Sequence, residues 1–133
     1  MFSVYKQYNR LNAYEKAYLG MYPHHVMVIK ESQNKAYKEA TVRFGHNLRN
    51  DKSDAFRHCF WCALLSKEIG YDKAIMFANA HEMGKSNPQN EREMDLWNNK
   101  VGAEIGRSKL LDSILSIKCM EALKSGKLKI INQ

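Results

Sequence analysis

The chain of 133 residues carries 21 Lys and Arg against 14 Asp and Glu, so its formal net charge is +7, and it contains three cysteines. This length suits one domain with a core of its own, the odd cysteine count argues against a disulfide framework, and the basic balance favours anionic partners. No apolar run reaches the roughly 20 residues that span a bilayer, which argues against a membrane-spanning helix.

Apolar residues recur at helical spacing along most of the chain, and no segment alternates convincingly as a strand would. Asn12 and Glu15 have the spacing of a reciprocal helix cap, while Ser53 or Asp54 is expected to cap the third helix and Asp72 the fourth. The predicted helices cover approximately residues 12–20, 24–44, 54–69, 72–82, 91–105 and 108–124. We therefore predict an all-α fold over residues 1–133, a compact orthogonal bundle of about six short helices. The tail after residue 126 is predicted to be a short strand or a docked extension.

The third predicted helix, residues 54–69, is apolar on nearly every side, so we expect it to lie at the centre of the bundle. Cys59 and Cys62 within it are interpreted as small core residues rather than as a redox pair. In the fifth predicted helix, Gly102 and Gly106 should permit close contact with a neighbouring helix. The residues of this helix expected to face the core are Met94, Trp97, Val101 and Ile105.

Asp54 and His58 are one helical turn apart, so the carboxylate can orient the imidazole and raise its basicity. The alternative is a helix cap followed by a hydrogen-bonded core histidine. Arg57 beside them is either a clamp for an anion or a surface charge. This turn is therefore a candidate acid/base site next to a candidate anion contact.

Two further polar groups fall in helices that also carry core positions. His81 and Glu82 end the fourth predicted helix on its apolar side, and Asp95, Asn98 and Asn99 occupy positions i, i+3 and i+4 of the fifth. Burying an ionisable group without a partner is costly, so inward polar residues should be grouped. We expect His58, His81 and Asp95 to surround one cavity, with Glu82 or Asn99 at its edge. The alternatives are a core histidine beside a surface glutamate in the fourth helix, and a solvated polar face on the fifth.

The motifs D-A-F-R-H-C-F-W, A-H-E and M-D-L-W-N-N, in this order, resemble those of an uncharacterised all-helical bacterial domain found near the C-termini of secreted and polymorphic-toxin-type proteins. The resemblance implies a site made of Asp54, Arg57, His58, Trp61, His81, Glu82, Asp95, Asn98 and Asn99. A weaker similarity, carried by the R-H and A-H-E-M-G-K segments, is to HD-type metal-dependent phosphohydrolases. It implies that His58, His81, Glu82 and Asp95 bind a divalent metal. In that family an Asp stands where this chain has Glu82, and the last ligand follows farther along than Asp95 does.

Our leading hypothesis is a small hydrolase that acts as a bacterial effector or toxin domain on a phosphoester or phospholipid ester. The expected catalytic residues, which are also the candidate ligands of a divalent metal, are His58, His81, Glu82 and Asp95. The expected substrate-binding residues are Asp54, Arg57, Trp61, Asn98 and Asn99.

The expected partners are an anionic substrate, nucleic acid and, for a toxin, a cognate immunity protein. The first residues lack the apolar core of a signal peptide, so we expect a soluble bacterial protein that is delivered or secreted by a signal-peptide-independent route. One alternative is a non-catalytic helical module that binds an acidic protein or nucleic acid, with the His, Asn and Asp side chains as a buried structural network. Another is a nuclease toxin, which needs a basic groove leading to the same site.

Overall fold

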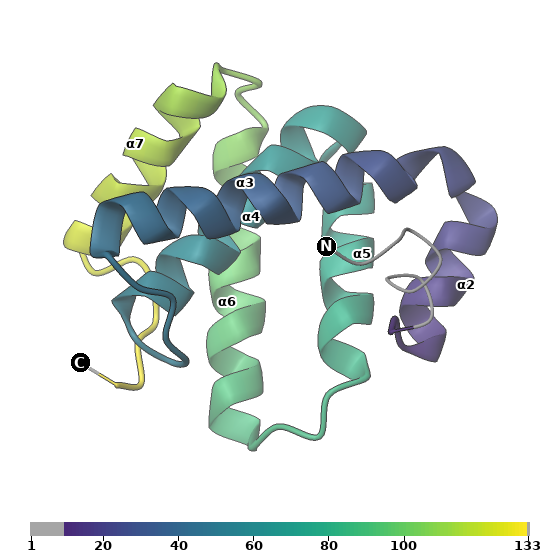
Figure 1. Ribbon diagram of the computed structural model, residues 1–133, viewed down its shortest axis with the longest axis horizontal. Helices are drawn as coiled ribbons and strands as arrows, with labels where there is room; N and C mark the ends of the chain where they lie inside the picture. Colours follow the sequence, from purple (N-terminus) through teal and green to yellow (C-terminus); the bar gives the residue numbers. More distant parts are fainter. Residues whose placement is uncertain (1–9, 133) are drawn as a thin grey trace.

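The computed structural model describes residues 10–132, and helices hold most of them. The helices are α2 (Ala13–Met21), the short 3₁₀ helix η1 (Pro23–His25), α3 (Val26–Phe44), α4 (Lys52–Ile69), α5 (Tyr71–Met83), α6 (Gln89–Gly106) and α7 (Asp112–Lys124). Residues 10–132 contain no β-strand, so the all-α prediction is confirmed. Helices α5 and α6 run side by side, and α3 packs on α4 and passes across both of them in the view of Figure 1. In the same range, no helix combines the length and apolar character needed to cross a membrane.

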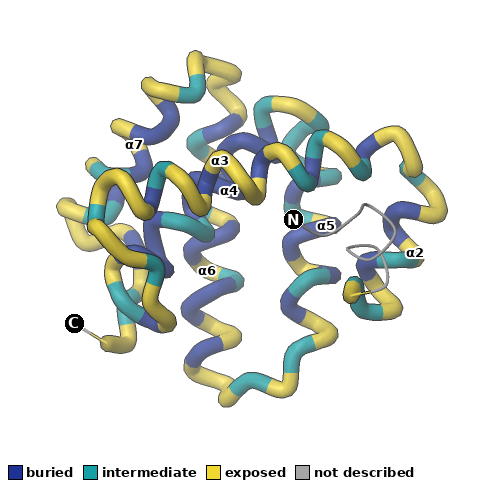
Figure 2. The backbone as a smooth tube through the Cα atoms, in the orientation of Figure 1, coloured by how far each residue is buried: buried dark blue, intermediate teal, exposed yellow. Residues whose placement is uncertain are grey.

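Helix α4 forms the centre of the bundle, as its apolar pattern predicts. It packs against α3, α5, α6 and α7, and 12 of its 18 residues are buried (Figure 2). Cys59 and Cys62 are fully buried free thiols, which confirms their interpretation as small core residues. Most side chains of α4 therefore contact another helix, and its exposed residues, Lys52 and Glu68, lie near its ends.

The start of α4 differs from the prediction. Asp51, rather than Ser53 or Asp54, is the N-cap, because its side chain accepts a hydrogen bond from the backbone N–H of Asp54 at 3.1 Å. The Asp54 carboxylate is thereby left for other contacts. Helix α5 also begins differently, since it follows Gly70 without a side-chain cap, and Asp72 lies inside its first turn.

The buried face of α6 was predicted wrongly in part. Met94 is buried, but Trp97 is 44 % exposed and Val101 and Ile105 are only half-buried. The residues that α6 buries are Glu91, Met94, Asp95, Asn98, Asn99, Gly102, Ala103 and Gly106. A polar and glycine-rich stripe therefore faces the core in place of the expected apolar one.

The two glycines explain this orientation of α6, and their predicted close helix contact is confirmed. A Cβ atom added to Gly102 would lie 2.0 Å from the carbonyl oxygen of Cys59, and one added to Gly106 would lie 2.2 Å from that of Ala63. Both distances are far below any van der Waals contact, so α6 approaches the backbone of α4 only where side chains are missing. The face that carries the glycines consequently has to be the inner one.

The C-terminal segment is a docked extension, which was one of the two predicted alternatives. The Asn98 side chain donates to the Lys129 carbonyl oxygen at 2.9 Å and accepts from the Lys129 N–H at 2.8 Å. Trp97 donates its indole N–H to the carbonyl oxygen of Lys127 at 2.7 Å. The preceding helix, α7, begins at Asp112 and not near Ser108 as predicted.

Replacing Gly102 or Gly106 with alanine should lower the free energy of unfolding by about 1–3 kcal/mol, because the new methyl group would push α6 away from the α4 backbone. Urea denaturation measures this change. Gly20→Ala is the matched control, since a Cβ at Gly20 on α2 meets no atom within 4 Å. The control should be neutral or slightly stabilising. Equal stability of all three variants would show that the α4–α6 contact is looser than described.

Candidate functional site

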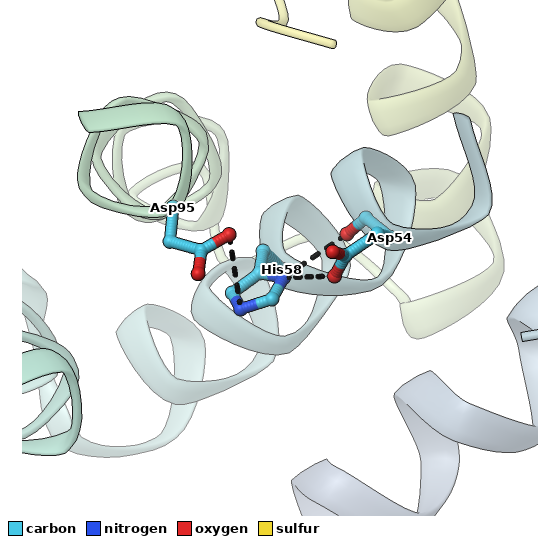
Figure 3. Close-up of side chains that lie close together, drawn as sticks. All are labelled: Asp54, His58 and Asp95. Atoms are coloured by element: carbon cyan, nitrogen blue, oxygen red, sulfur yellow. Dashed lines mark hydrogen bonds and ion pairs between the residues drawn. The ribbon is translucent and has the colours of Figure 1, made fainter. Parts of the chain in front are cut away.

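His58 lies in a buried polar cluster formed by α4, α5 and α6. Its Nδ1 is 2.8 Å from Asp54 Oδ1 and 3.0 Å from the Asp54 carbonyl oxygen, one turn earlier on α4. Its Nε2 points toward α6, where Asp95 Oδ1 lies 3.6 Å away (Figure 3). Glu82 Oε1, from α5, is 3.8 Å from the same nitrogen. Both of these Nε2 distances are too long for a hydrogen bond.

The carboxylates of the cluster differ in how well they are stabilised. Burial opposes ionisation of Asp54, but the hydrogen bonds from His58 and the Asn50 N–H, together with the charge of Arg57, lower the pKa of Asp54. Burial raises the pKa of Asp95, the charge of His58 opposes the shift, and the charges of Glu82 and Asp54 add to it, so that the pKa lies at about 6. The folded structure therefore favours the ionised form of Asp54 and disfavours the ionised form of Asp95.

Burial alone would lower the pKa of His58. The hydrogen bond to Asp54 and the negative charges of Asp95, Asp54 and Glu82 outweigh burial and raise the pKa. The imidazole therefore sits where positive charge is favoured.

Several buried polar atoms of this cluster have no hydrogen-bond partner. They are Oδ1 of Asp95, Oε2 of Glu82 and both amide atoms of Asn99. Leaving such a group unsatisfied typically costs about 1–3 kcal/mol. Asp54, His58 and Asp95 each offer one ligand atom, and these three atoms lie within 4.8 Å of one another, close enough to hold a metal ion.

A second histidine, His81 at the end of α5, has a carboxylate partner from a distant part of the chain. Its Nδ1 lies 2.9 Å from Oε2 of the buried Glu15. The other Glu15 oxygen accepts from the Asn12 N–H at 3.0 Å, which completes the predicted capping box of α2. Burial would raise the pKa of Glu15, but the hydrogen bonds from His81 and Asn12 lower it.

The start of α2 also holds the end of α5 directly. Asn12 donates its side-chain amide to the carbonyl oxygens of Ala80 at 3.0 Å and His81 at 3.3 Å. This approach requires Gly84, because a Cβ there would lie 2.3 Å from the Asn12 side-chain nitrogen. Two residues of one helix cap thus fix both the backbone and the imidazole of His81.

His58 and His81 line the same pocket, which has a volume of about 350 Å³ and lies among α3, α4 and α5. Trp61 also lines it and meets the His81 ring edge-on, with 5.4 Å between the ring centroids. The lining residues are Gln33, Ala36, Tyr37, Arg57, His58, Trp61, His81 and Lys85. None of these residues is acidic, so the formal charges that the lining contributes are positive.

Residues 16–127 match the family described as a domain of unknown function, DUF6973. The chain belongs to the DUF6973 family. Searches of curated proteins and of solved structures found no match to this DUF6973 domain. The family match agrees with the resemblance to an uncharacterised domain, and it does not confirm the toxin-type context or the HD-type similarity.

The DUF6973 domain brings together part of the predicted site. Arg57, His58, Trp61 and His81 meet at the pocket, while Asp54, Glu82 and Asp95 lie around His58. His81, predicted as a metal ligand beside His58, has its Nδ1 hydrogen-bonded to Glu15. Asn98 holds the C-terminal segment and does not line the pocket, and Asn99 is buried without a partner.

Three contributors to the site of this DUF6973 domain were missed in the sequence. The role of Glu15 in the capping box accounts for its position in the sequence, and nothing in the neighbouring residues indicates that its second oxygen contacts His81. Lys85 follows α5 in an ordinary polar turn, and Asn47, which accepts from Arg57 Nη1 at 2.7 Å, precedes α4 by several residues. Only the packing of α2 and of the α3–α4 loop on the bundle brings Glu15 to His81 and Asn47 to Arg57.

Asp95→Asn should stabilise the metal-free protein at pH 7.5 by roughly 1–3 kcal/mol. With a pKa near 6 in the folded state against 3.8 ordinarily, folded Asp95 keeps a proton that the unfolded chain releases. Stability therefore falls as pH rises through about 4 to 6, and asparagine avoids that loss. Urea denaturation in chelator at pH 4 and pH 7.5 measures the difference, which should be small at pH 4.

Glu93→Gln is the control for removal of an acidic charge, because Glu93 is exposed on the same helix. Its unfolding free energy should match that of the parent within about 0.5 kcal/mol. A destabilised Asp95→Asn protein at pH 7.5 would mean that the Asp95 charge is compensated in the folded state.

Proposed function

We propose that this DUF6973 domain is a small hydrolase that cleaves a phosphoester bound in the pocket. The supporting observation is that two histidines, each with a carboxylate on its Nδ1, line one pocket whose charged lining is basic. Imidazoles supply proton transfer near neutral pH, and basic side chains bind and stabilise phosphoryl oxygens. The net charge of +7 favours the same class of anionic substrate.

Arg57 and Lys85 are the groups that would hold the phosphoryl oxygens. Arg57 donates to Asn47 Oδ1 and to Asp54 Oδ1, both at 2.7 Å, so its guanidinium is fixed at the pocket wall. A guanidinium has five N–H donors, and these two contacts leave others for a ligand. Lys85 Nζ lies 3.3 Å from Glu82 Oε1 and adds a second positive charge at the pocket.

His81 is the group proposed to transfer the proton. Glu15 accepts the Nδ1 hydrogen, so the neutral ring keeps a lone pair on Nε2, and the buried carboxylate stabilises the imidazolium that forms. The His81 side chain is 30 % exposed against 11 % for His58, whose Nε2 faces carboxylates. In the proposed step a water oxygen bonds to phosphorus, its proton passes to His81, and the bond to the leaving alcohol breaks. The departing oxygen takes a proton from solvent.

The proposal extends to a cofactor and a biological role. A divalent cation is the cofactor that the carboxylates around His58 are suited to hold, and it would add positive charge beside the pocket. The resemblance to toxin-type domains favours a bacterial effector with a cognate immunity protein as partner. The alternative of a non-catalytic module predicts a closed polar network, and the pocket that both histidines line favours the hydrolase.

His81→Ala should reduce kcat by about 10²–10⁴-fold, because it removes the proton acceptor. Arg57→Ala should reduce kcat/KM through weaker phosphoryl binding. Hydrolysis is measured on bis(p-nitrophenyl) phosphate, on DNA and RNA oligonucleotides, and on phospholipid vesicles, each with and without Mn²⁺ or Zn²⁺. His24→Ala is the matched control, since His24 is exposed and outside the pocket. An inactive parent on all substrates, or full activity of His81→Ala, contradicts the proposal.

Glu15→Gln should separate the two roles of Glu15. Glutamine can still accept from the Asn12 N–H, so the capping box and the melting temperature should be largely kept. The negative charge beside His81 is lost, and kcat should fall by about 10-fold or more. Glu15→Ala is the comparison, which loses the cap as well. If the glutamine variant keeps full kcat, or loses as much stability as the alanine variant, Glu15 does not support His81 in catalysis.

A further inference from the structure

The protonation of His58 is fixed by what surrounds its ring. Nδ1 faces the Asp54 carbonyl oxygen at 3.0 Å and Asp54 Oδ1 at 2.8 Å, and both are acceptors. Nδ1 must therefore carry a hydrogen, and the neutral ring then directs the Nε2 lone pair toward the oxygens of Asp95 and Glu82. The lone pair and the two carboxylates repel one another, so a positive charge between Nε2 and the carboxylate oxygens is required to stabilise this arrangement.

The spacing at Nε2 indicates which charge fits. A proton on Nε2 would draw a carboxylate oxygen to roughly 2.7–2.9 Å, as charge-assisted hydrogen bonds do. The observed separations are 3.6 Å to Asp95 and 3.8 Å to Glu82. A cation bonded at about 2.1 Å to a nitrogen and an oxygen, at tetrahedral to trigonal angles, separates the two atoms by roughly 3.4–3.6 Å. The gap therefore suits a bound cation better than a proton.

Asp95 and Glu82, the two carboxylates that face this gap, each keep one buried oxygen without a hydrogen-bond partner. Asp95 is 4 % exposed and its Oδ1 has no hydrogen-bond partner. Glu82 is 1 % exposed and its Oε2 has no partner either. Two buried side chains, one from α5 and one from α6, thus face the same imidazole nitrogen. The oxygen that Asp95 presents is unsatisfied, whereas the oxygen that Glu82 presents, Oε1, accepts from Lys85 at 3.3 Å.

Asp54 is the third carboxylate beside His58, but both of its oxygens are already engaged. Oδ1 accepts from Arg57 at 2.7 Å and from His58 Nδ1, and Oδ2 accepts from the Asn50 N–H at 2.7 Å. This is how a carboxylate that orients a metal-binding histidine is placed, on the ring nitrogen opposite the metal. Asp54 is accordingly a positioning residue and not a ligand.

We propose that a divalent transition-metal cation binds at His58 Nε2, Asp95 and Glu82, in the buried cluster behind the pocket. One imidazole and two carboxylates form a mixed set that suits Mn²⁺ or Zn²⁺, whereas Mg²⁺ prefers oxygen ligands and retained waters. The inference rests on the proposed function, whose cofactor it assigns to named ligands and a metal class, and its test is independent because the cation would bind whether or not the pocket turns over a phosphoester.

The test is titration of the metal-stripped full chain with MnCl₂, ZnCl₂ or MgCl₂, followed by calorimetry and by melting temperature without substrate. Mn²⁺ or Zn²⁺ should bind one ion per chain and raise the melting temperature. Asp95→Asn and Glu82→Gln should each weaken binding by 100-fold or more, whereas Asp54→Asn should weaken it by about 10–100-fold, as a positioning residue does. Glu93→Gln, on the exposed side of α6, is the matched control and should bind like the parent.

A second measurement on the parent protein covers variants that fail to fold. Long-range ¹H–¹⁵N spectra should show Zn²⁺ shifting Nε2 of His58, with Nδ1 still protonated and His81 unchanged. The proposal is overturned by an absence of saturable Mn²⁺ and Zn²⁺ binding, by tight binding of Mg²⁺ alone, by ligation through His81, or by an Asp95→Asn protein that binds like the parent. These readouts need no substrate, so the two proposals can fail separately. Absence of metal binding contradicts the metal site and not the hydrolase function, whereas an inactive protein that binds the metal contradicts the hydrolase function and not the metal site.

Discussion

The contact between α4 and α6 contains no side chains at Gly102 and Gly106, so the carbonyl groups of Cys59 and Ala63 face bare backbone. This contact sets both the distance and the rotation of α6 about its axis. Asp95 lies on the same buried stripe as the glycines, and the rotation that places them on α4 also turns Asp95 toward His58. The polar cluster is thus a consequence of helix packing, and its cost is met by the burial of a large apolar core around α4.

The charges of the domain are separated by depth. Arg57 and Lys85 lie at the pocket wall, whereas Asp54, Glu82 and Asp95 lie deeper, around His58. Two of the buried anions are paired with the positive groups of the pocket wall, Asp54 with Arg57 at 2.7 Å and Glu82 with Lys85 at 3.3 Å. An approaching anion still meets positive groups first, and the imidazole of His58 stands at the boundary between the two layers.

Local sequence signals were sufficient for most of the fold. The Asn12–Glu15 capping box, the apolar periodicity and the all-round apolar character of α4 predicted the helices and the central one correctly, although the caps of α4 and α5 were misassigned. The spacing of Asp54 and His58 predicted their contact. The face of α6 was misjudged because Trp97 and its apolar neighbours compete with glycine and asparagine for the interior. Burial of large apolar groups normally wins that competition, and here close backbone contact reverses it.

The pairing of His81 with Glu15 spans 66 positions, and no local rule relates the two residues. Its consequence concerns local stability. Helix α2 packs mainly on α5 and η1, away from the central helix, so its detachment costs less than global unfolding. Such an opening would release the His81 imidazole from its carboxylate while the cluster around His58, held by α4 and α6, remained assembled. The hydrogen-bonded state of His81 therefore depends on the docking of α2, whereas the contacts of His58 with Asp54 and Asp95 do not involve that helix.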